Sequence, residues 1–216
     1  LPFWREPALL RALPLSVAIV CRNNDATIGR TLESVAGLAA EVVAVDSGST
    51  DGTIPLLERH GARVIRSDWK GHVATKQMAL EACVQEWVLC IDSDESLQPD
   101  LKRAVSEAIA RKEPAIDGYL VNRKVWYRDR PLNFAWQPER RLRLVRRGKA
   151  AWTGLDPHDR LELNSAAAPP PLLAGDLRHD SISTFPDFLA KQAQHARTMA
   201  ASMHREGQRG NYVKLV

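Results

Sequence analysis

The chain has 216 residues, of which 44% are hydrophobic and 26% are charged, a composition that suits a globular domain and excludes a disordered chain. Its formal net charge is +4, yet residues 123–149 alone hold ten Lys and Arg and two acidic residues, a local charge of +8. No apolar run approaches the roughly 18 residues of a membrane-spanning helix. The three cysteines lack metal-ligand spacing and lie in apolar runs, so we interpret them as buried thiols in a reducing compartment.

The first half of the chain alternates between two kinds of apolar pattern. Short runs rich in β-branched residues predict buried strands at 15–21, 41–46, 62–67 and 87–92. Between them, apolar residues at three- and four-residue spacing predict helices near 28–38, 54–61 and 73–84. This alternation predicts a βαβ series, that is, a parallel sheet covered by helices on both faces.

The second half departs from this rhythm after a further predicted helix at 96–112. Alternating patterns predict strands at 118–128 and 141–147, so this half is expected to be mixed or antiparallel. A proline-rich loop is predicted at 165–175. The last element is an amphipathic helix at 185–203, and we expect its apolar side, with Phe185 and Phe188, to pack on the core.

Polar and acidic residues follow three of the predicted parallel strands: Arg22–Asp25, Asp46–Gly52 and Asp92–Glu95. Ligands bind beyond the carboxyl ends of the strands in an open α/β sheet, so this edge is the predicted site. A turn and a helix cap account for Ser49–Gly52. They account poorly for Asp46, because a buried carboxylate needs hydrogen-bond donors, which the N–H groups of a nucleobase could supply.

The segment Asp92–Glu95 places three carboxylates within four residues. One interpretation is a capped turn before the next helix. The other is a cation site, because such carboxylates repel each other unless a cation lies among them. Oxygen ligands suit Mg²⁺ or Mn²⁺, which would in turn hold a diphosphate. The alternation of Asp92 and Asp94 predicts that the two side chains face different partners, one a metal and the other a ribose hydroxyl.

The segments VAIVCRNND, EVVAVDSGSTDGT, KGHVATKQMAL and WVLCIDSDE, in this order, resemble the family 2 inverting glycosyltransferases of GT-A fold. The closer likeness is to the lipopolysaccharide core biosynthesis branch, β-1,4-glucosyltransferase-like, and it runs from Ser16 to Met203. It implies a single GT-A domain over 1–216, an α/β fold with a Rossmann-like mixed sheet flanked by helices. A nucleotide-sugar-binding half would span 15–112. An acceptor-binding half with the amphipathic helix would span 113–216 and be truncated at its C-terminus.

The resemblance also implies roles for residues of the nucleotide site: Asn23 and Asp46 at the base, Lys76 near the nucleotide, Asp92 at the ribose, and Asp94 with His179 at a Mg²⁺ or Mn²⁺ ion. Three departures from the branch's pattern leave the donor sugar and the catalytic base open. Asn24 stands where the branch has an acidic residue, Gln77 replaces an Asn, and Pro157 replaces a hydrophobic residue.

The implied reaction is inverting, metal-dependent transfer of a hexose, glucose in the branch, from a UDP-sugar to an anionic saccharide-lipid such as the heptose of the lipopolysaccharide inner core. The catalytic base would be Asp159, or as a second choice Asp156. A salt bridge to Arg160 or to the basic segment is the alternative role for Asp159. The implied acceptor-binding residues are Arg140, Arg143, Arg146 and His158, since guanidinium groups bind phosphate in bidentate fashion.

The implied location is the cytoplasmic face of the bacterial inner membrane, with peripheral membrane contact and no nucleic-acid partner. Two other function classes stay open at this point. A nucleotidyltransferase acting on a sugar phosphate would also use βαβ units, carboxylates and a divalent cation, although CRNND lacks the usual glycine-rich loop. A nucleic-acid-binding module would use the basic 123–149 segment, but that segment lacks aromatic interleaving and leaves Asp92–Glu95 unexplained.

Overall fold

A computed structural model gives the fold of residues 12–155, 158–165, 169–205 and 207. The first half forms the strands β1 (Leu13–Cys21), β2 (Ala39–Asp46), β3 (Arg63–Arg66) and β4 (Trp87–Asp92), alternating with the helices α1 (Asp25–Val35), α2 (Thr53–Arg59) and α3 (His72–Glu81). The strand β1 pairs in parallel with β2 and β4, and β2 pairs in parallel with β3. The predicted parallel βαβ series is confirmed.

The second half is mixed, as expected. It comprises β5 (Glu95–Leu97), α4 (Pro99–Arg111), β6 (Gly118–Tyr127), β7 (Arg130–Pro131), β8 (Arg140–Arg146), β9 (Ala150–Leu155), β10 (His158–Leu163), β11 (Leu172–His179) and α5 (Phe185–Arg205). The strand β8 is antiparallel to β4 and β6, whereas β11 is parallel to β6 and antiparallel to β5.

Two predicted boundaries were wrong. The helix expected from residue 96 begins at Pro99, because Glu95–Leu97 instead pairs with β11 as a short strand. The loop expected to run to residue 175 ends earlier, since β11 begins at Leu172, directly after the prolines. A proline lacks the N–H that a central strand needs, so the prolines mark the start of this strand.

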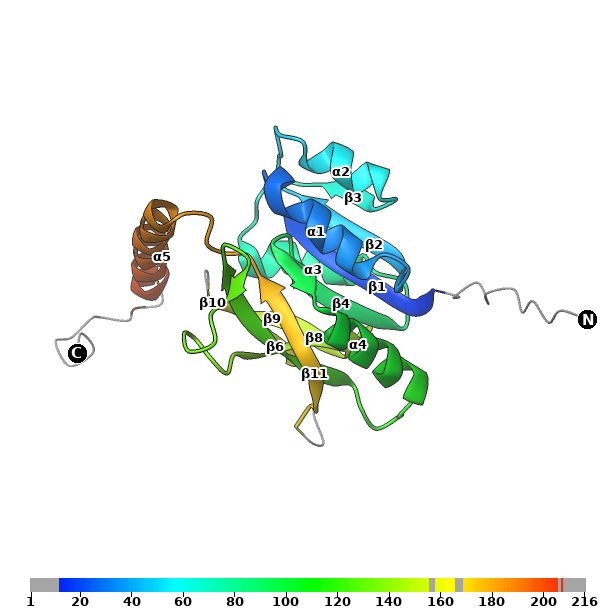
Figure 1. Ribbon diagram of the computed structural model, residues 1–216. Coiled ribbons are helices and arrows are strands. Elements are labelled where there is room, and N and C mark those ends of the chain that lie inside the picture. Colours follow the sequence, from blue (N-terminus) through cyan, green and yellow to red (C-terminus); the bar gives the residue numbers. More distant parts are fainter. Residues whose placement is uncertain (1–11, 156–157, 166–168, 206, 208–216) are drawn as a thin grey trace, which may run out of the picture.

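Both halves build one main sheet, with the order β3-β2-β1-β4-β8-β6-β11-β5 in the described part of the chain (Figure 1). The antiparallel strand β8 lies between β4 of the first half and β6 of the second. The hairpin of β9 and β10 forms a separate small sheet. The carboxyl end of β4 therefore lies next to elements that the second half contributes.

Alternate residues of the central strands serve two core layers. In β4, Trp87, Leu89 and Ile91 join the layer that α1, α2 and α4 cover. Val88 and Cys90 join the opposite layer, which contains residues of α3 and of the β9–β10 hairpin. The prediction that both faces of the sheet are covered is confirmed, and so is the burial of all three cysteines as free thiols. Burial raises the pKa of each thiol to about 12.

The C-terminal helix α5 stands apart from the sheet (Figure 1). Its first turn is capped by Thr184, whose hydroxyl accepts the Asp187 N–H at 3.3 Å. Phe185 and Leu189 are 61% and 52% exposed, so the prediction that the apolar side packs on the core is wrong for these residues. The ring of Phe188 instead meets Trp136 in the loop after β7, with ring centroids 6.0 Å apart. No helix in the described ranges is both long and apolar enough to cross a membrane.

Gly175 allows β11 to approach the start of α4. Its φ is +87°, and a Cβ there would lie 2.9 Å from Leu101 Cα and still closer to the Leu101 backbone nitrogen. We expect Gly175→Ala to lower the free energy of unfolding in urea well beyond the roughly 1–2 kcal/mol that a left-handed Ala costs by itself. Gly61→Ala is the matched control, because φ is +72° there and a Cβ would meet nothing within 4 Å. Equal losses for the two variants would contradict this account.

Candidate active site

A cleft of about 1190 Å³ opens beyond the carboxyl ends of β1 and β4. Both halves line it, and its walls hold most of the charged residues that the sequence singled out: Lys76, Asp92, Asp94, Arg143, Asp159 and His179. The volume exceeds the roughly 300–1,000 Å³ of typical small-molecule sites, so two substrates can fit side by side. The predicted position of the site, at this edge of the sheet, agrees with the cleft.

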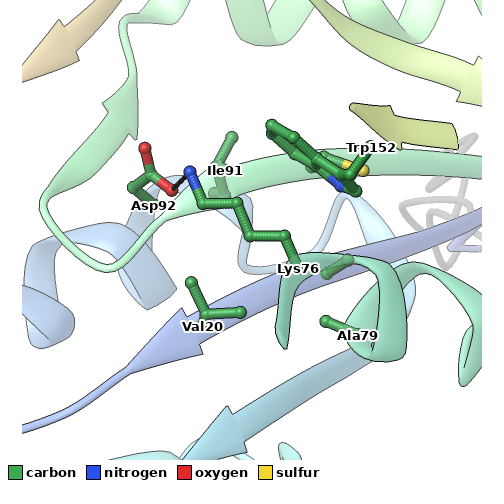
Figure 2. A pocket seen from close by; sticks show the side chains of 8 residues that line it. Val20, Lys76, Ala79, Ile91, Asp92 and Trp152 are labelled. Carbon is green, nitrogen blue, oxygen red and sulfur yellow. Dashed lines mark ion pairs between the residues drawn. The ribbon is translucent and has the colours of Figure 1, made fainter. Parts of the chain in front are cut away.

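Lys76 occupies the junction between the two halves. Its Nζ lies 2.7 Å from Asp92 Oδ1 and 2.8 Å from Asp159 Oδ2. The ammonium also lies 4.7 Å from the ring centroid of Trp152, which belongs to β9. Figure 2 shows the side chain extending from α3 to Asp92 beside this ring. The space around its stem is about 10 Å³, room for at most one water molecule.

This environment keeps Lys76 charged. Burial opposes the ammonium, but Asp92 and Asp159 outweigh it and raise the pKa of Lys76. Burial likewise opposes the charged form of Asp92, while Lys76 and Arg143 lower the pKa of that carboxyl well below its usual range. The cluster is therefore an ion-pair network with the lysine between two carboxylates, one from each half of the chain.

Glu95, the third carboxylate of the predicted cation site, has cations of its own. It is fully buried, its Oε1 lies 2.7 Å from Arg143 and 3.4 Å from Arg123, and its Oε2 accepts the Asp92 N–H at 2.9 Å. The same Nη2 of Arg143 that contacts Glu95 also lies 3.3 Å from Asp92 Oδ2. Side-chain cations therefore offset the repulsion at Asp92 and Glu95, so the predicted metal ion is not needed for these two carboxylates. Glu95 is consequently not available to a metal.

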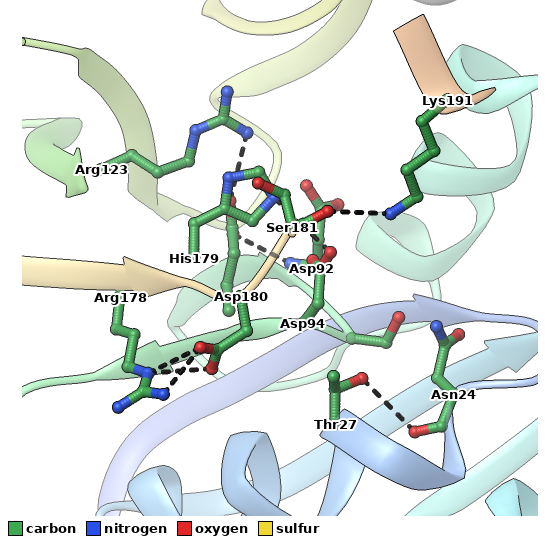
Figure 3. Close-up of polar contacts among 12 residues, drawn as sticks. Asn24, Thr27, Asp92, Asp94, Arg123, Arg178, His179, Asp180, Ser181 and Lys191 are labelled. Carbon is green, nitrogen blue, oxygen red and sulfur yellow. Dashed lines mark hydrogen bonds and ion pairs between the residues drawn. The ribbon is translucent and has the colours of Figure 1, made fainter. Parts of the chain in front are cut away.

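Asp94 turns the other way and faces His179 at the end of β11. Its Oδ2 lies 3.5 Å from His179 Nε2, and its carbonyl accepts the Asp180 N–H at 2.9 Å (Figure 3). Burial opposes the imidazolium, but the neighbouring carboxylate raises the pKa of His179. The two side chains point in different directions, as the alternation predicts. Their predicted partners, a metal and a ribose hydroxyl, stay a prediction.

The Asp94–His179 pair is the candidate metal position. Within the described residues, no group of three or more His, Cys, Asp or Glu side chains could hold a metal ion. His179 Nδ1 is nevertheless buried without a hydrogen-bond partner, and an oxygen and a nitrogen donor face each other. These two groups fit part of a Mg²⁺ or Mn²⁺ shell, whose other positions substrate phosphates and water would fill. The described residues alone supply too few ligands for a closed site.

The residues predicted to hold the nucleobase lie at the ends of two neighbouring strands: Asp46 is the last residue of β2, and Asn23 follows β1. Asp46 is buried, and its carboxylate accepts the N–H groups of Gly48 and Ser49 at 3.0 and 2.9 Å, together with the Ser49 hydroxyl. The hydrogen-bond donors that the buried Asp46 carboxylate needs thus come from the turn that follows Asp46, so a nucleobase is not required to supply them. Asn23 is exposed, and its Oδ1 accepts the Thr50 N–H at 2.8 Å. Neither Asn23 nor Asp46 lines the cleft.

The predicted catalytic base, Asp159, lies on β10, and its carboxylate is directed at Lys76. Its expected alternative partner, Arg160, pairs with Glu162 instead, at 2.6 Å. Its neighbour His158 is exposed and lines the cleft. The second candidate base, Asp156, lies outside the described residues.

The structure separates the three arginines that were predicted to bind the acceptor. Arg140 is exposed on the cleft wall. Arg143 is only 4% exposed and its guanidinium serves Glu95 and Asp92. Arg146 is directed away from the cleft, where it pairs with Glu86 and lies over the Trp87 ring. The guanidinium groups of Arg143 and Arg146 thus pair with carboxylates of the protein itself.

The basic segment as a whole is much less of a cationic surface than its sequence charge indicates. Five of its cations pair with acidic side chains: Arg123, Lys124, Arg141, Arg143 and Arg146. This internal pairing weakens the nucleic-acid-binding interpretation, which depended on a +8 surface.

Two important residues escaped the sequence reasoning. Arg123 was read only as part of a charge run, although it pairs with Glu95 and with Glu139 at 2.6 Å. Trp152 packs between two cations, with Arg143 5.7 Å and Lys76 4.7 Å from its ring centroid. The alternation in AWTGL, followed after two residues by HDRLEL, is a hairpin signal that would have placed Trp152.

Comparisons with known proteins find glycosyltransferases among the relatives of this chain. The family model described as Glycosyl transferase family 2 matches residues 16–161. The lipopolysaccharide core biosynthesis glycosyltransferase LpsC of Rhizobium meliloti is 31% identical over 225 residues, covering 96% of this chain and 78% of that protein. An uncharacterized glycosyltransferase of Rickettsia felis is 40% identical over 96 residues, which are 44% of this chain and 34% of that one.

A solved structure extends the similarity to the whole fold. Mannosyl-3-phosphoglycerate synthase from Rubrobacter xylanophilus superposes with a TM-score of 0.53 at 18% identity, covering 93% of this chain and 77% of that chain. At this identity the similarity concerns the fold alone. It extends beyond residue 161, where the family match ends.

Glu95 provides a test of the buried network. We expect Glu95→Ala to lower the free energy of unfolding by about 3–5 kcal/mol. The substitution removes the nearest carboxylate of Arg143 and leaves the guanidinium charge buried. Glu86→Ala is the control, since the Glu86 side chain is 57% exposed and its pair with Arg146 contributes at most about 1 kcal/mol. Chemical denaturation of both variants measures the difference. A loss for Glu95→Ala no larger than that for Glu86→Ala would refute the network's structural role.

Proposed function

Since the chain belongs to glycosyl transferase family 2 and is a glycosyltransferase, we propose that its cleft transfers a hexose from a UDP-sugar to an anionic glycolipid. The observation that carries this proposal is the Lys76 junction. One ammonium lies within 2.8 Å of a carboxylate from the predicted donor half and of a carboxylate from the predicted acceptor half. Donor and acceptor groups therefore meet at one place in one cleft.

The donor is proposed to bind on the first-half side of the cleft. Asp46 and Asn23 belong to the loops that would hold the uracil ring, and Asp92 is the proposed partner of the ribose. Lys76 would contact the diphosphate. Asp94 and His179 would hold Mg²⁺ or Mn²⁺ between them and the diphosphate, and this ion would offset the charge that grows on the leaving phosphate.

Asp159 is the proposed base of a single in-line displacement. The acceptor hydroxyl oxygen bonds to the anomeric carbon while the bond from that carbon to the diphosphate oxygen breaks, and UDP leaves with the electron pair. The hydroxyl proton passes to Asp159, whose side chain is only 9% exposed. Attack from the face opposite the leaving group inverts the anomeric carbon. The cleft supplies the alignment that this displacement requires.

The acceptor is proposed to be a phosphorylated sugar of a lipopolysaccharide core, such as an inner-core heptose. The similarity to a protein named for lipopolysaccharide core biosynthesis supports this class of acceptor. Arg140 and His158 are the exposed groups of the predicted acceptor set that line the cleft. An exposed guanidinium on that wall suits an anionic sugar, because it can bind a phosphate in bidentate fashion.

A peripheral site at the cytoplasmic face of the inner membrane is proposed for the protein. An aromatic patch, defined as Phe134, Trp136, Phe185, Phe188 and Leu189, supports it. Apart from Phe188, each of these side chains is more than half exposed, and ring contacts join Trp136, Phe188 and Phe185. Trp136 and Phe188 also line the cleft, so a lipid-linked acceptor could enter from this side.

Calorimetric titration with UDP tests the donor site. We expect binding in the presence of Mn²⁺ or Mg²⁺ that falls at least about tenfold with EDTA, because the ion links Asp94 and His179 to the diphosphate. Asp94→Ala should produce the same loss, and added Mn²⁺ should not restore it.

Asp100→Ala is a matched control, because its side chain is 70% exposed on α4 and outside the cleft. It should leave the UDP affinity unchanged. If the unchanged protein binds no UDP with either metal, the proposed donor class is wrong.

Sedimentation with vesicles containing phosphatidylglycerol tests the membrane contact. We expect the double variant Phe185→Ser, Leu189→Ser to lower the partition coefficient at least tenfold, because burying each side chain contributes roughly 1.5–3 kcal/mol. Val84→Ser is the control, since Val84 is 63% exposed but lies outside the patch. Equal binding by all three proteins would exclude the aromatic patch as the membrane contact.

A further inference from the structure

Lys76 is shared by two carboxylates that are not equivalent. Asp92 has a second cation, because Arg143 lies 3.3 Å from its Oδ2. For Asp159, Lys76 at 2.8 Å is the ion-pair partner, and no second one exists among the described residues. Moving the ammonium would leave Asp92 compensated and Asp159 without a cation.

We propose that Lys76 exchanges partners during the reaction. In the donor-free protein its ammonium neutralises Asp159. When the donor binds, the diphosphate takes the ammonium, and Asp159 is left free to accept a proton. This inference rests on the proposed function, in which Asp159 is the base and Lys76 contacts the diphosphate.

The geometry favours an exchange over a permanent pair. The lysine side chain is long and unbranched, and it lines the same cleft as Asp94 and His179. A diphosphate bound there would carry more negative charge than one carboxylate, so it would compete well for the ammonium. The Trp152 ring, 4.7 Å from the ammonium, gives the cation a surface over which it can shift.

The exchange would make the base depend on the donor. A carboxylate paired to an ammonium is a poor proton acceptor, because proton uptake would break the pair. Asp159 would therefore be released from the ammonium, and be free to take the hydroxyl proton, only when a diphosphate is present. Lys76 acts in this scheme as a positioning residue that links donor binding in one half to the base in the other.

A double-variant cycle measured by UDP titration with Mn²⁺ tests the exchange. If UDP must draw Lys76 away from Asp159, then Asp159→Asn should tighten UDP binding, by about tenfold. Lys76→Met should weaken UDP binding by at least about tenfold, because the diphosphate loses its cation. In the Lys76→Met background, Asp159→Asn should have no further effect. Asp159→Asn should abolish sugar transfer even as it binds UDP more tightly.

Two controls separate the exchange from simpler effects. Glu162→Gln removes another carboxylate of β10 that lines the cleft but pairs with Arg160, so it should leave the UDP affinity within about twofold. Lys76→Arg keeps a cation at the junction, and it should restore the tightening by Asp159→Asn. It also serves if Lys76→Met does not fold, which far-ultraviolet circular dichroism would report.

The outcomes are distinguishable. If Asp159→Asn tightens UDP binding equally in the Lys76→Met background, the gain in affinity comes from removing a negative charge near the cleft. That result would overturn the exchange. Unchanged or weaker UDP binding by Asp159→Asn would overturn it as well, while leaving the donor site intact. Absence of UDP binding by the unchanged protein would overturn the proposed function and this inference with it.

Discussion

The burial of the Glu95 carboxylate constrains the rest of the site. A fully buried carboxylate needs a cation and hydrogen-bond donors, and Glu95 obtains them from Arg143, Arg123 and the Asp92 N–H. Arg143 belongs to β8 and Arg123 to β6, so this requirement holds the second half of the sheet against the end of β4. Once β8 is in place, Arg143 also reaches Asp92. The positions of Arg143 and Asp92 at the cleft therefore depend on the burial of the Glu95 carboxylate.

In this family 2 glycosyltransferase of GT-A fold, the network brings charged side chains from both halves of the chain to one cleft. The antiparallel strand β8 lies between the parallel strands of the first half and the mixed strands of the second. The β9–β10 hairpin, which follows β8, then brings Asp159 over α3 to Lys76. The Lys76 junction is thus a consequence of sheet order, and the cleft lies where the two halves meet.

Sequence patterns predicted the first half well, because strands buried on both faces leave uninterrupted apolar runs. They missed β5, β7, β9, β10 and β11, which are short or carry polar residues on one side. Asp92 and Asp94 were predicted to diverge, since alternation along a strand is local. Their partners were not predictable, because Arg143 and Arg123 lie 48 and 28 residues from Glu95 and meet it only through strand pairing. The donors of Asp46 were local and could have been anticipated from the glycine and serine of its own turn.

The position of Arg143 in the chain has a consequence for protein synthesis. Translation proceeds at roughly 5–20 residues per second, so Arg143 leaves the ribosome roughly 2–10 seconds after Glu95. Until then, β4 lacks the antiparallel neighbour β8 and the Glu95 carboxylate lacks its closest cation. The nascent first half therefore cannot complete its core ahead of the second. All four parallel strands precede β8 in the chain, so we expect them to reach their full stability only when this later strand arrives.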